Sequence, residues 1–172
     1  MPTPAYMSIK GTNQTDITTG AFTPASVGNI YQEGHEDEFL VEAFNHAVTL
    51  PRDPQSGQPS GQRVHSPVVV TKIFDKSSPQ LYQALATGEV LTECKIKWYR
   101  TSQTGHQEHY FTIDLVDAIL VSIKASMPNC QDPGQAHFTH LEEVSLAYRK
   151  ITWTHEIAGT SGSDDWRKPV SA

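Results

Sequence analysis

Short segments in which apolar and polar residues alternate recur along this 172-residue chain, with turn residues between them. The clearest is 91–101 (LTECKIKWYRT), in which Cys94, Ile96 and Trp98 fall on one face. A period of two is the pattern of a β-strand with one buried side. A Gly-containing turn at 102–105 and another such run follow, so this part of the chain is predicted to form a β-hairpin.

Further strands are expected wherever the same pattern or a run of β-branched residues occurs. These segments are 5–10, 37–50, 63–72, 108–115, 116–125 and 141–157. The alternation changes phase within 37–50 and again near Arg149 and Lys150, and such a change needs a bulge or a bend. Many short strands in meander order are typical of an antiparallel sandwich or barrel.

One helix is expected, directly after the strand at 63–72. Ser78 can cap it, Pro79 suits its first position and Gly88 can end it. The predicted fold class is therefore mainly β: an antiparallel β-barrel of two packed sheets with one short α-helix at its side. The length favours a single domain over residues 1–172, with a loose polar tail at 159–172.

Two long loops interrupt the expected strands. Residues 11–38 are rich in small polar and acidic side chains, with at most one strand near 27–31. Residues 51–62 (PRDPQSGQPSGQ) hold three prolines and two glycines, a composition that no regular element tolerates. Because strands resume on both sides, this segment is predicted to be an exposed loop, which at this length is usually functional or disordered.

The charge and hydropathy patterns argue against two classes of partner. The formal net charge is −6 and the lysines and arginines are scattered, whereas nucleic acid and anionic membranes both require clustered positive charge. The first residues, MPTPAYMSIKG, lack the basic and apolar regions of a signal peptide. No window approaches the ~18 consecutive apolar residues of a membrane-spanning helix.

The cysteines and tryptophans give weaker indications. Cys94 and Cys130 are far apart and show no disulfide or metal-binding spacing, so two reduced thiols are the favoured interpretation and a disulfide is the alternative. Trp98 and Trp153 fall in phase with the expected core. Trp166 lies in the polar tail, where a contact with another chain is the favoured role.

The sequence offers no catalytic, cofactor-binding or metal-binding constellation. The pairs His106 with His109 and His137 with His140 are spaced by three, which on a strand directs the two rings to opposite faces. Motifs of nucleophilic hydrolases, phosphate-binding loops and zinc proteases do not occur. A structural or binding role is therefore favoured, and an enzyme that uses His and Asp at strand ends is an alternative.

Three long segments, taken in order, resemble the Hcp (haemolysin-coregulated protein) family, the tube proteins of bacterial type VI secretion. They are 63–91 (RVHSPVVVTKIFDKSSPQLYQALATGEVL), 96–123 (IKWYRTSQTGHQEHYFTIDLVDAILVSI) and 140–166 (HLEEVSLAYRKITWTHEIAGTSGSDDW). The N-terminal AYMSIKG also looks like the family's first strand. The succession of a strand, the TK-x-x-DKSSP sequence, a helix and a hairpin is the specific part of the resemblance.

The resemblance implies a structural protein, not an enzyme, built as a β-barrel with one α-helix. Six copies would form a ring with a wide channel, and rings would stack into a tube. A contractile sheath on a baseplate would expel this tube, capped by a spike protein, and small effector proteins would travel in its lumen. The protein would be cytoplasmic before firing and then secreted to the extracellular space or a target cell, without a signal peptide.

The resemblance also assigns roles to two sites. The family's loop that reaches toward the adjacent ring matches residues 51–62, and the stacking residues would be Arg52, Asp53, Pro54, Gln55, Ser56 and Gly57. Asn45 matches a small polar residue that faces the channel and is implicated in holding cargo. The alternatives are an idle flexible loop and, for the whole protein, a monomeric β-barrel module that binds carbohydrate or peptide.

Overall fold

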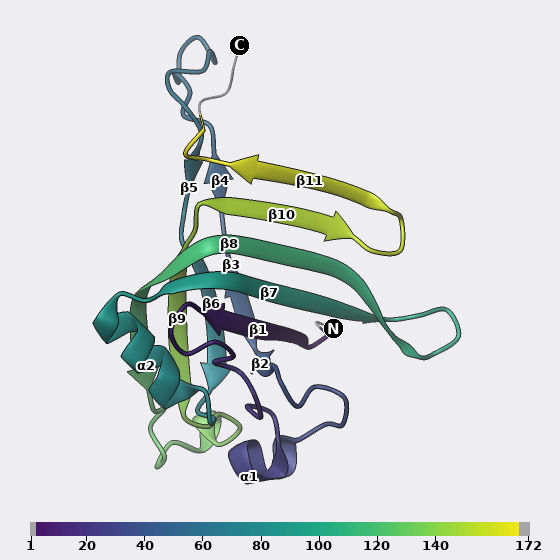
Figure 1. Cartoon of the computed structure of the whole chain (residues 1–172). Coiled ribbons are helices and arrows are strands. Elements are labelled where there is room, and N and C mark those ends of the chain that lie inside the picture. Colours follow the sequence, from purple (N-terminus) through teal and green to yellow (C-terminus); the bar gives the residue numbers. More distant parts are fainter. Residues whose placement is uncertain (1–2, 169–172) are drawn as a thin grey trace.

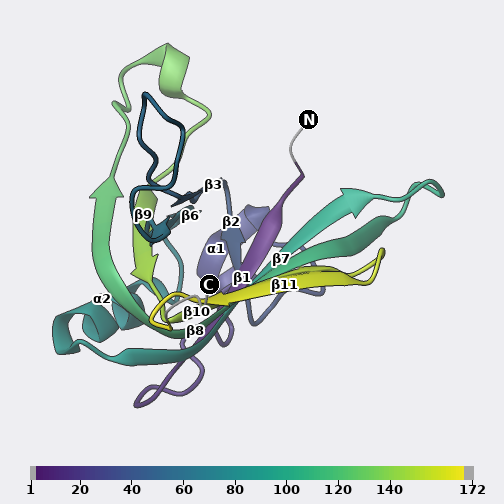
Figure 2. The ribbon, with the colours of Figure 1, turned by 90° about the horizontal axis from the view of Figure 1, so that it is seen from above.

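A long bent strand, β8 (Gln107–Ser126), connects two parts of one antiparallel sheet in the computed structural model, which describes residues 3–168. One edge of β8 pairs with β7 (Val90–Thr101). The other edge pairs first with β10 (Lys150–His155) and then with β9 (Leu141–Ala147). Figure 2 shows β8 curving from one part of the molecule to the other.

The bend in β8 occurs at Asp117, whose φ of 51° lies in the left-handed region that non-glycine residues rarely adopt. The Asp117 carboxylate accepts a hydrogen bond from Arg149 Nε at 2.8 Å, and the Arg149 amide donates to Val116 O at 3.2 Å. These contacts hold the turned backbone in place. The two strands expected at 108–115 and 116–125 are therefore halves of one strand that changes direction at their junction.

The main sheet is curled so that the two ends of its hydrogen-bonded path are neighbours in the chain. The strand order is β2 (Phe39–Val41), β1 (Ala5–Gly11), β7, β8, β9, β6 (Val68–Ile73) and β3 (Ala43–Asn45). Only Glu42 separates β2 from β3, and its amide donates to Thr71 O in β6 at 2.8 Å. The chain thus passes from one end of the sheet to the other through a single residue.

The expected phase change within 37–50 is confirmed, because this segment is divided among three short strands. The third of them, β4 (Val48–Thr49), leaves the main sheet and pairs only with β5 (Val64–His65). The mainly β, antiparallel class is also confirmed, although the barrel is one continuous curled sheet plus this ribbon, not two separate packed sheets. Figure 1 shows β4 and β5 rising away from the rest of the molecule.

The core lies inside the curled sheet and consists of the residues of each strand that point inward. The largest aliphatic members include Met7, Ile9, Leu91, Ile96, Leu115 and Leu146, all fully buried. Trp98 and Trp153 are partly buried and pack against this core, as their phase predicted. Period-two burial runs through residues 68–71 of β6 and 94–97 of β7, as one-sided packing of a strand requires, whereas β1 is buried on both faces over residues 5–7.

The predicted helix is α2 (Ser78–Thr87), which buries Leu81 and Ala84 and lies against β8. Pro79 occupies its first turn, and Gly88 ends it in the left-handed conformation with a φ of 66°. Ser77, rather than Ser78, is the residue before its first turn. A second, four-residue helix, α1 (Pro24–Val27), and short 3₁₀ turns at Gly28–Ile30 and Pro133–Gln135 lie in the long loops.

The segment between β6 and α2 is fixed by a lysine that is completely buried. Lys72 Nζ donates to Glu142 Oε1 at 2.5 Å, to Ser78 Oγ at 3.1 Å and to the carbonyl of Ile73 at 2.9 Å. It also forms an ion pair with Asp75 Oδ1 at 3.1 Å. The Lys, Asp and Ser positions of the TK-x-x-DKSSP sequence therefore converge on one site, which explains their spacing.

Two local expectations are wrong, and a third is confirmed in part. Residues 160–165 of the expected loose tail form β11 (Thr160–Asp165), which pairs with the whole of β10, while residues 169–172 of that tail lie outside the described residues. The segment 141–157 is two strands, β9 and β10, that pair with different halves of β8, and the break between them at residues 148–149 lies where the phase change was predicted. The segment near 27–31 is helical turn, not strand.

Neither cysteine is in a disulfide, as the favoured interpretation of the sequence held. Cys94 is buried in β7 and Cys130 is exposed, and both are free thiols. Burial raises the pKa of the Cys94 thiol well above its ordinary value. Among residues 3–168, none of the helices has the length and apolar character that crossing a bilayer requires.

Candidate functional site

A hairpin projects from the body of the molecule and carries the loop that the sequence singled out. It runs from His46 to Ser66, with β4 and β5 as its legs, and every residue from 47 to 62 is exposed. Its tip lies at the top of Figure 1. We call residues 46–66 the projecting hairpin. An isolated two-stranded ribbon has little stability of its own in water.

The tip of the projecting hairpin is a built turn. Asp53 Oδ1 accepts hydrogen bonds from the amides of Gln55 at 2.7 Å and Ser56 at 3.2 Å, and these bonds lower the pKa of the Asp53 carboxyl. The amide of Gly57 donates to Asp53 O at 2.8 Å, and Gly57 has a positive φ of 72°. Arg52 pairs across the hairpin with Pro59. Residues 52–57 are thus brought together at the tip.

The ribbon exposes apolar side chains that no part of the chain between residues 3 and 168 covers. Val48, Leu50 and Val64 are 42, 56 and 49% exposed. These side chains lie outside the core and are not stabilised by burial within it. They are therefore suited to contact with another molecule. Periodicity could not reveal them, since each apolar leg of the ribbon is only two or three residues long.

The base of the projecting hairpin is tied to the C-terminal part of the chain. The Arg63 guanidinium donates to both carboxylate oxygens of Asp164 in β11, at 2.5 and 2.8 Å, and to the carbonyls of Asp165 and Lys168. This pairing lowers the pKa of the Asp164 carboxyl, and His65 contributes to the same shift. The hairpin is therefore fixed at its base and free at its tip.

A second set of contacts at the base surrounds Tyr148. The Tyr148 hydroxyl lies 2.6 Å from His46 Nε2 and 2.6 Å from His65 Nδ1, and His65 Nε2 lies 2.7 Å from Asp164 Oδ2. Trp166 Nε1 donates to Tyr148 O at 2.5 Å, and its ring lies 5.5 Å from the His65 ring. This cluster has no signature in the sequence, because its members come from four separate segments. Trp166, for which a contact with another chain is the favoured role, has a partner within its own chain and is still 38% exposed, so that role stays a prediction.

Asn45 is exposed at the end of β3 and lies on the outward face of the sheet, beside the base of the projecting hairpin. Two cross-strand rows cross this face on β3, β6, β9 and β8. One row consists of Asn45, Val69, Ser145 and Ser122, and the other of Ala43, Thr71, Glu143 and Lys124. We call these eight residues the small-residue face. Their side chains are short apart from one acid and one base, which stand opposite each other.

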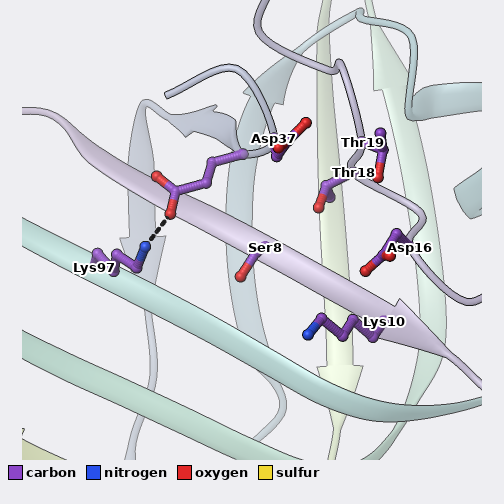
Figure 3. Close-up of a pocket in the computed structure, with 8 residues that line it drawn as sticks. Ser8, Lys10, Asp16, Thr18, Thr19, Asp37 and Lys97 are labelled. Carbon is purple, nitrogen blue, oxygen red and sulfur yellow. Dashed lines mark hydrogen bonds and ion pairs between the residues drawn. The ribbon is translucent and has the colours of Figure 1, made fainter. Parts of the chain in front are cut away.

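The hollow drawn in Figure 3 has a volume of about 300 Å³ and lies beside β1. Its charged groups include Lys97, which forms an ion pair with Glu38, and Asp37, whose Oδ1 accepts from the Gly20 amide at 3.0 Å. Lys10 pairs with Glu93 at 3.9 Å. Because its charges are largely neutralised by neighbours in the same chain, this hollow has the character of a surface crevice between loops.

The histidine pairs do not form a metal centre in the part of the chain that the structure describes, where no three His, Cys, Asp or Glu side chains are arranged to hold a metal ion. His109 Nε2 is hydrogen bonded to Thr112 Oγ1 at 2.8 Å. The His137 ring lies 4.1 Å from the Phe138 ring, and His140 lies beside Phe74.

Comparison with known proteins gives the chain its relatives. The family model described as "Type VI secretion system effector, Hcp" matches residues 6–155. The "Major exported protein" of Pseudomonas aeruginosa is 69% identical over 171 residues, which is 99% of each chain. These matches confirm the resemblance drawn from the sequence.

Solved structures agree in fold as well as in sequence. One described as an Hcp protein is 51% identical, with a TM-score of 0.90 over 95% of this chain and 99% of that one. The secreted protein Hcp3 from Pseudomonas aeruginosa is 59% identical, with a TM-score of 0.82 over 96% and 99%. A mutant Hcp1 from E. coli EAEC 042 is 31% identical, with a TM-score of 0.77 over 95% and 98%. The chain therefore belongs to the Hcp family of type VI secretion system proteins.

Proposed function

We propose that this protein is a structural subunit of the type VI secretion tube, in which six copies form a ring and rings stack end to end. Its family is one of secreted structural proteins, not of enzymes. The observation that carries the proposal is the projecting hairpin, an ordered ribbon with exposed Val48, Leu50 and Val64 that stands outside the core. An ordered apolar ribbon outside the core suits a subunit that contacts a further copy of itself.

The stacking role belongs to the tip, residues 52–57. Asp53 holds the turn in shape through its own hydrogen bonds, so the tip would meet the adjacent ring with little loss of conformational entropy. Arg52 and Gln55 would supply polar contacts, and Val48, Leu50 and Val64 apolar ones nearer the body.

Lateral contacts within the ring would use surfaces that the single chain leaves open. Val90 and Ile119 stand opposite each other on β7 and β8, and both are exposed, as is Val121. The outer edge of β11 has no partner strand within the described part of the chain. A ring closed by head-to-tail contacts brings such unlike surfaces of neighbouring copies together.

The small-residue face would line the channel, with Asn45 as a contact for small effector proteins. Short side chains leave the channel open, and the opposed Glu143 and Lys124 keep the local charge near balance. Such a wall can touch many cargoes weakly. The spike protein, the sheath and the baseplate would be the further partners, and the protein would be cytoplasmic before firing and secreted with the tube.

Purified protein examined by size-exclusion chromatography with light scattering and by negative-stain microscopy tests the ring. We expect a mass of six chains and annular particles. A single-chain mass over a wide concentration range would contradict the proposal and favour the monomeric binding module.

Replacing residues 53–61 with a Gly/Ser segment of the same length tests the stacking role. We expect rings to persist while end-to-end stacks and secretion are lost. The matched control replaces residues 129–136, another exposed loop, and should leave stacks unchanged. Stacks that survive the first replacement would assign the hairpin to another task.

Asn45→Ala tests the cargo contact, with Thr92→Ala on β7 as the control. We expect the protease resistance that a bound effector gains from the ring to fall for the Asn45 variant alone. Equal protection by both variants would remove Asn45 from the cargo surface.

A further inference from the structure

The contacts at the base of the projecting hairpin form a continuous chain of four polar groups. In order they are His46, the Tyr148 hydroxyl, His65 and Asp164, and the three successive distances are 2.6, 2.6 and 2.7 Å. His46 and His65 belong to the two ends of the hairpin, Tyr148 follows β9, and Asp164 lies in β11. The chain therefore links both legs of the hairpin to the body.

With both histidines neutral, only one arrangement of protons uses every contact. Asp164 is ionised and can only accept, so His65 carries its hydrogen on Nε2. His65 Nδ1 must then accept from the Tyr148 hydroxyl, whose oxygen accepts from His46 Nε2–H. Each member donates to the next, from His46 to Asp164.

This hydrogen-bonded chain of four groups can take up one proton without losing any of its three contacts. A proton on His65 Nδ1 makes that nitrogen donate to the Tyr148 oxygen, and the hydroxyl hydrogen can turn to His46 Nε2 if His46 carries its own hydrogen on Nδ1. The added charge on His65 lies beside the Asp164 carboxylate, at 2.7 Å from Nε2 to Oδ2.

A second proton cannot be accommodated in the same way. With both rings charged, His46 Nε2 and His65 Nδ1 both donate to the Tyr148 oxygen, and the hydroxyl hydrogen has no acceptor left in the chain. The two positive rings are then 6.4 Å apart, centre to centre, around the hydroxyl of Tyr148, a buried residue. Repulsion and an unsatisfied donor act together against this state.

The two histidines differ in the groups that surround them. His46 faces His65 in β5, Tyr148 in the segment after β9 and the Phe44 ring in β3. Desolvation lowers the pKa of His46, and the charge of His65 lowers it further. His65 faces Tyr148, Trp166 and the Asp164 carboxylate, which Arg63 also contacts. Among residues 3–168, a carboxylate therefore faces His65, whereas the contacts of His46 are with neutral groups and a second histidine.

We propose that the His46–Tyr148–His65–Asp164 chain is a proton-operated latch, which holds the projecting hairpin against the body until both histidines are charged and then releases it. In consequence, and here the inference rests on the proposed function, ring stacking through the hairpin is strong near neutral pH and weakens under mild acid. The Arg63–Asp164 pair stays closed at that pH, so release begins at the His46 leg.

Hydrogen exchange of the hairpin amides across pH 8 to 5, corrected for intrinsic rates, tests the latch on the full-length protein. Histidine ring NMR signals give the two protonation steps in the same samples. We expect exchange at residues 46–50 and 64–66 to rise at least about 10-fold as His46 becomes charged, with the β1 and β7 amides unchanged. A flat profile across the His46 titration overturns the latch, whether or not the rings stack.

His46→Gln separates the latch from the titration of other groups. A glutamine amide can still donate to Tyr148 and cannot be charged, so this variant should keep its hairpin protected at pH 5. His137→Gln, in an exposed loop, is the matched control and should behave as the parent protein. If the parent protein forms no stacks at pH 7.5, the proposed function fails; if His46→Gln opens at the same pH as the parent, the latch fails.

Discussion

Two polar clusters hold distant segments of this protein together, and they differ in what surrounds them. The Lys72 cluster joins β6, α2 and β9 inside the body, and its lysine is fully buried. The Tyr148 cluster joins the projecting hairpin to the body, and Asp164 and His46 within it are partly exposed. The first cannot open unless the core opens, whereas the second can open while the core stays folded.

The same contrast appears in how well each cluster is satisfied. In the Lys72 cluster two carboxylates share one lysine, and Asp75 Oδ2 and Glu142 Oε2 are buried without a hydrogen-bond partner in the described structure. In the Tyr148 cluster every nitrogen and oxygen that faces the hydroxyl has a partner. The stability of the Lys72 cluster therefore depends on its lysine, whereas the stability of the Tyr148 cluster depends on how many protons its histidines carry.

Removing the lysine should have the largest effect. Lys72→Met keeps much of the side-chain volume but leaves Asp75 and Glu142 as uncompensated buried acids, and we expect a loss of about 3–5 kcal/mol in the free energy of unfolding. Urea denaturation followed by circular dichroism measures it. Lys76→Met, an exposed lysine four residues on, is the control and should change stability little. Equal effects of the two substitutions would mean that the buried cluster contributes nothing special.

Asp164→Asn should have an intermediate effect, because it weakens both the Arg63 pair and the end of the Tyr148 chain. Loss of charge-assisted hydrogen bonds at this partly exposed site is expected to cost about 1–2 kcal/mol at pH 7. The Asp164 pKa is lowered in the folded protein, so its stabilisation is full above the ordinary aspartate pKa and disappears as the pH falls through the lowered value.

The gap between Asp164→Asn and the parent protein should therefore close in strong acid, as thermal unfolding at a series of pH values would reveal. Asp16→Asn, an exposed aspartate in the loop after β1, is the control. A gap that is constant from pH 7 down to acid would show that the carboxylate charge does not matter at this position.

Tyr148→Phe should cost less, about 1 kcal/mol, because it removes one neutral hydroxyl and water can replace that hydroxyl at the partly exposed His46 ring. Its effect should concentrate on the projecting hairpin, whose amides should exchange faster at pH 7.5. Tyr31→Phe removes a hydroxyl that donates to Glu36 at 2.9 Å far from the hairpin, and it should leave hairpin exchange unchanged. Uniform loosening of the whole sheet by Tyr148→Phe would mean that the two clusters are not independent.

Much of the fold could be predicted because the relevant signals are local. Alternation in 91–101 located β7, and Pro79 and Gly88 located the ends of α2. The residues of β11 (TSGSDD) carry no apolar alternation, since this edge strand is held by backbone pairing with β10 and by the charged contacts of Asp164 and Asp165. Such a strand depends on its partner and leaves no pattern of its own.

The site divides in the same way. The composition of residues 51–62 identified the exposed loop, because proline and glycine act on their own backbone. The Tyr148 chain joins residues up to 102 positions apart, and a histidine beside a tyrosine has no sequence signature. For Lys72, the motif that contains it could be recognised in the sequence by resemblance. Its burial could not, because it follows only from the curled sheet around it.

The smallest effect on stability is expected at the tip of the hairpin, where a change should be felt only by a second molecule. Asp53→Ala removes the acceptor of the Gln55 and Ser56 amides, yet the turn is exposed and outside the core, so the unfolding midpoint should not change measurably. Exchange of those two amides should rise, and ring-to-ring association, measured by sedimentation, should weaken because the tip must be ordered on contact.

Asp132→Ala is the matched control, since Asp132 Oδ1 holds a similar turn by accepting from the Gly134 amide at 2.9 Å in another loop. If both substitutions weaken association alike, loop order in general is responsible and not the tip of the hairpin. If neither does, the tip does not carry the stacking contact, and the proposed division between a rigid body and a functional hairpin is wrong at the tip.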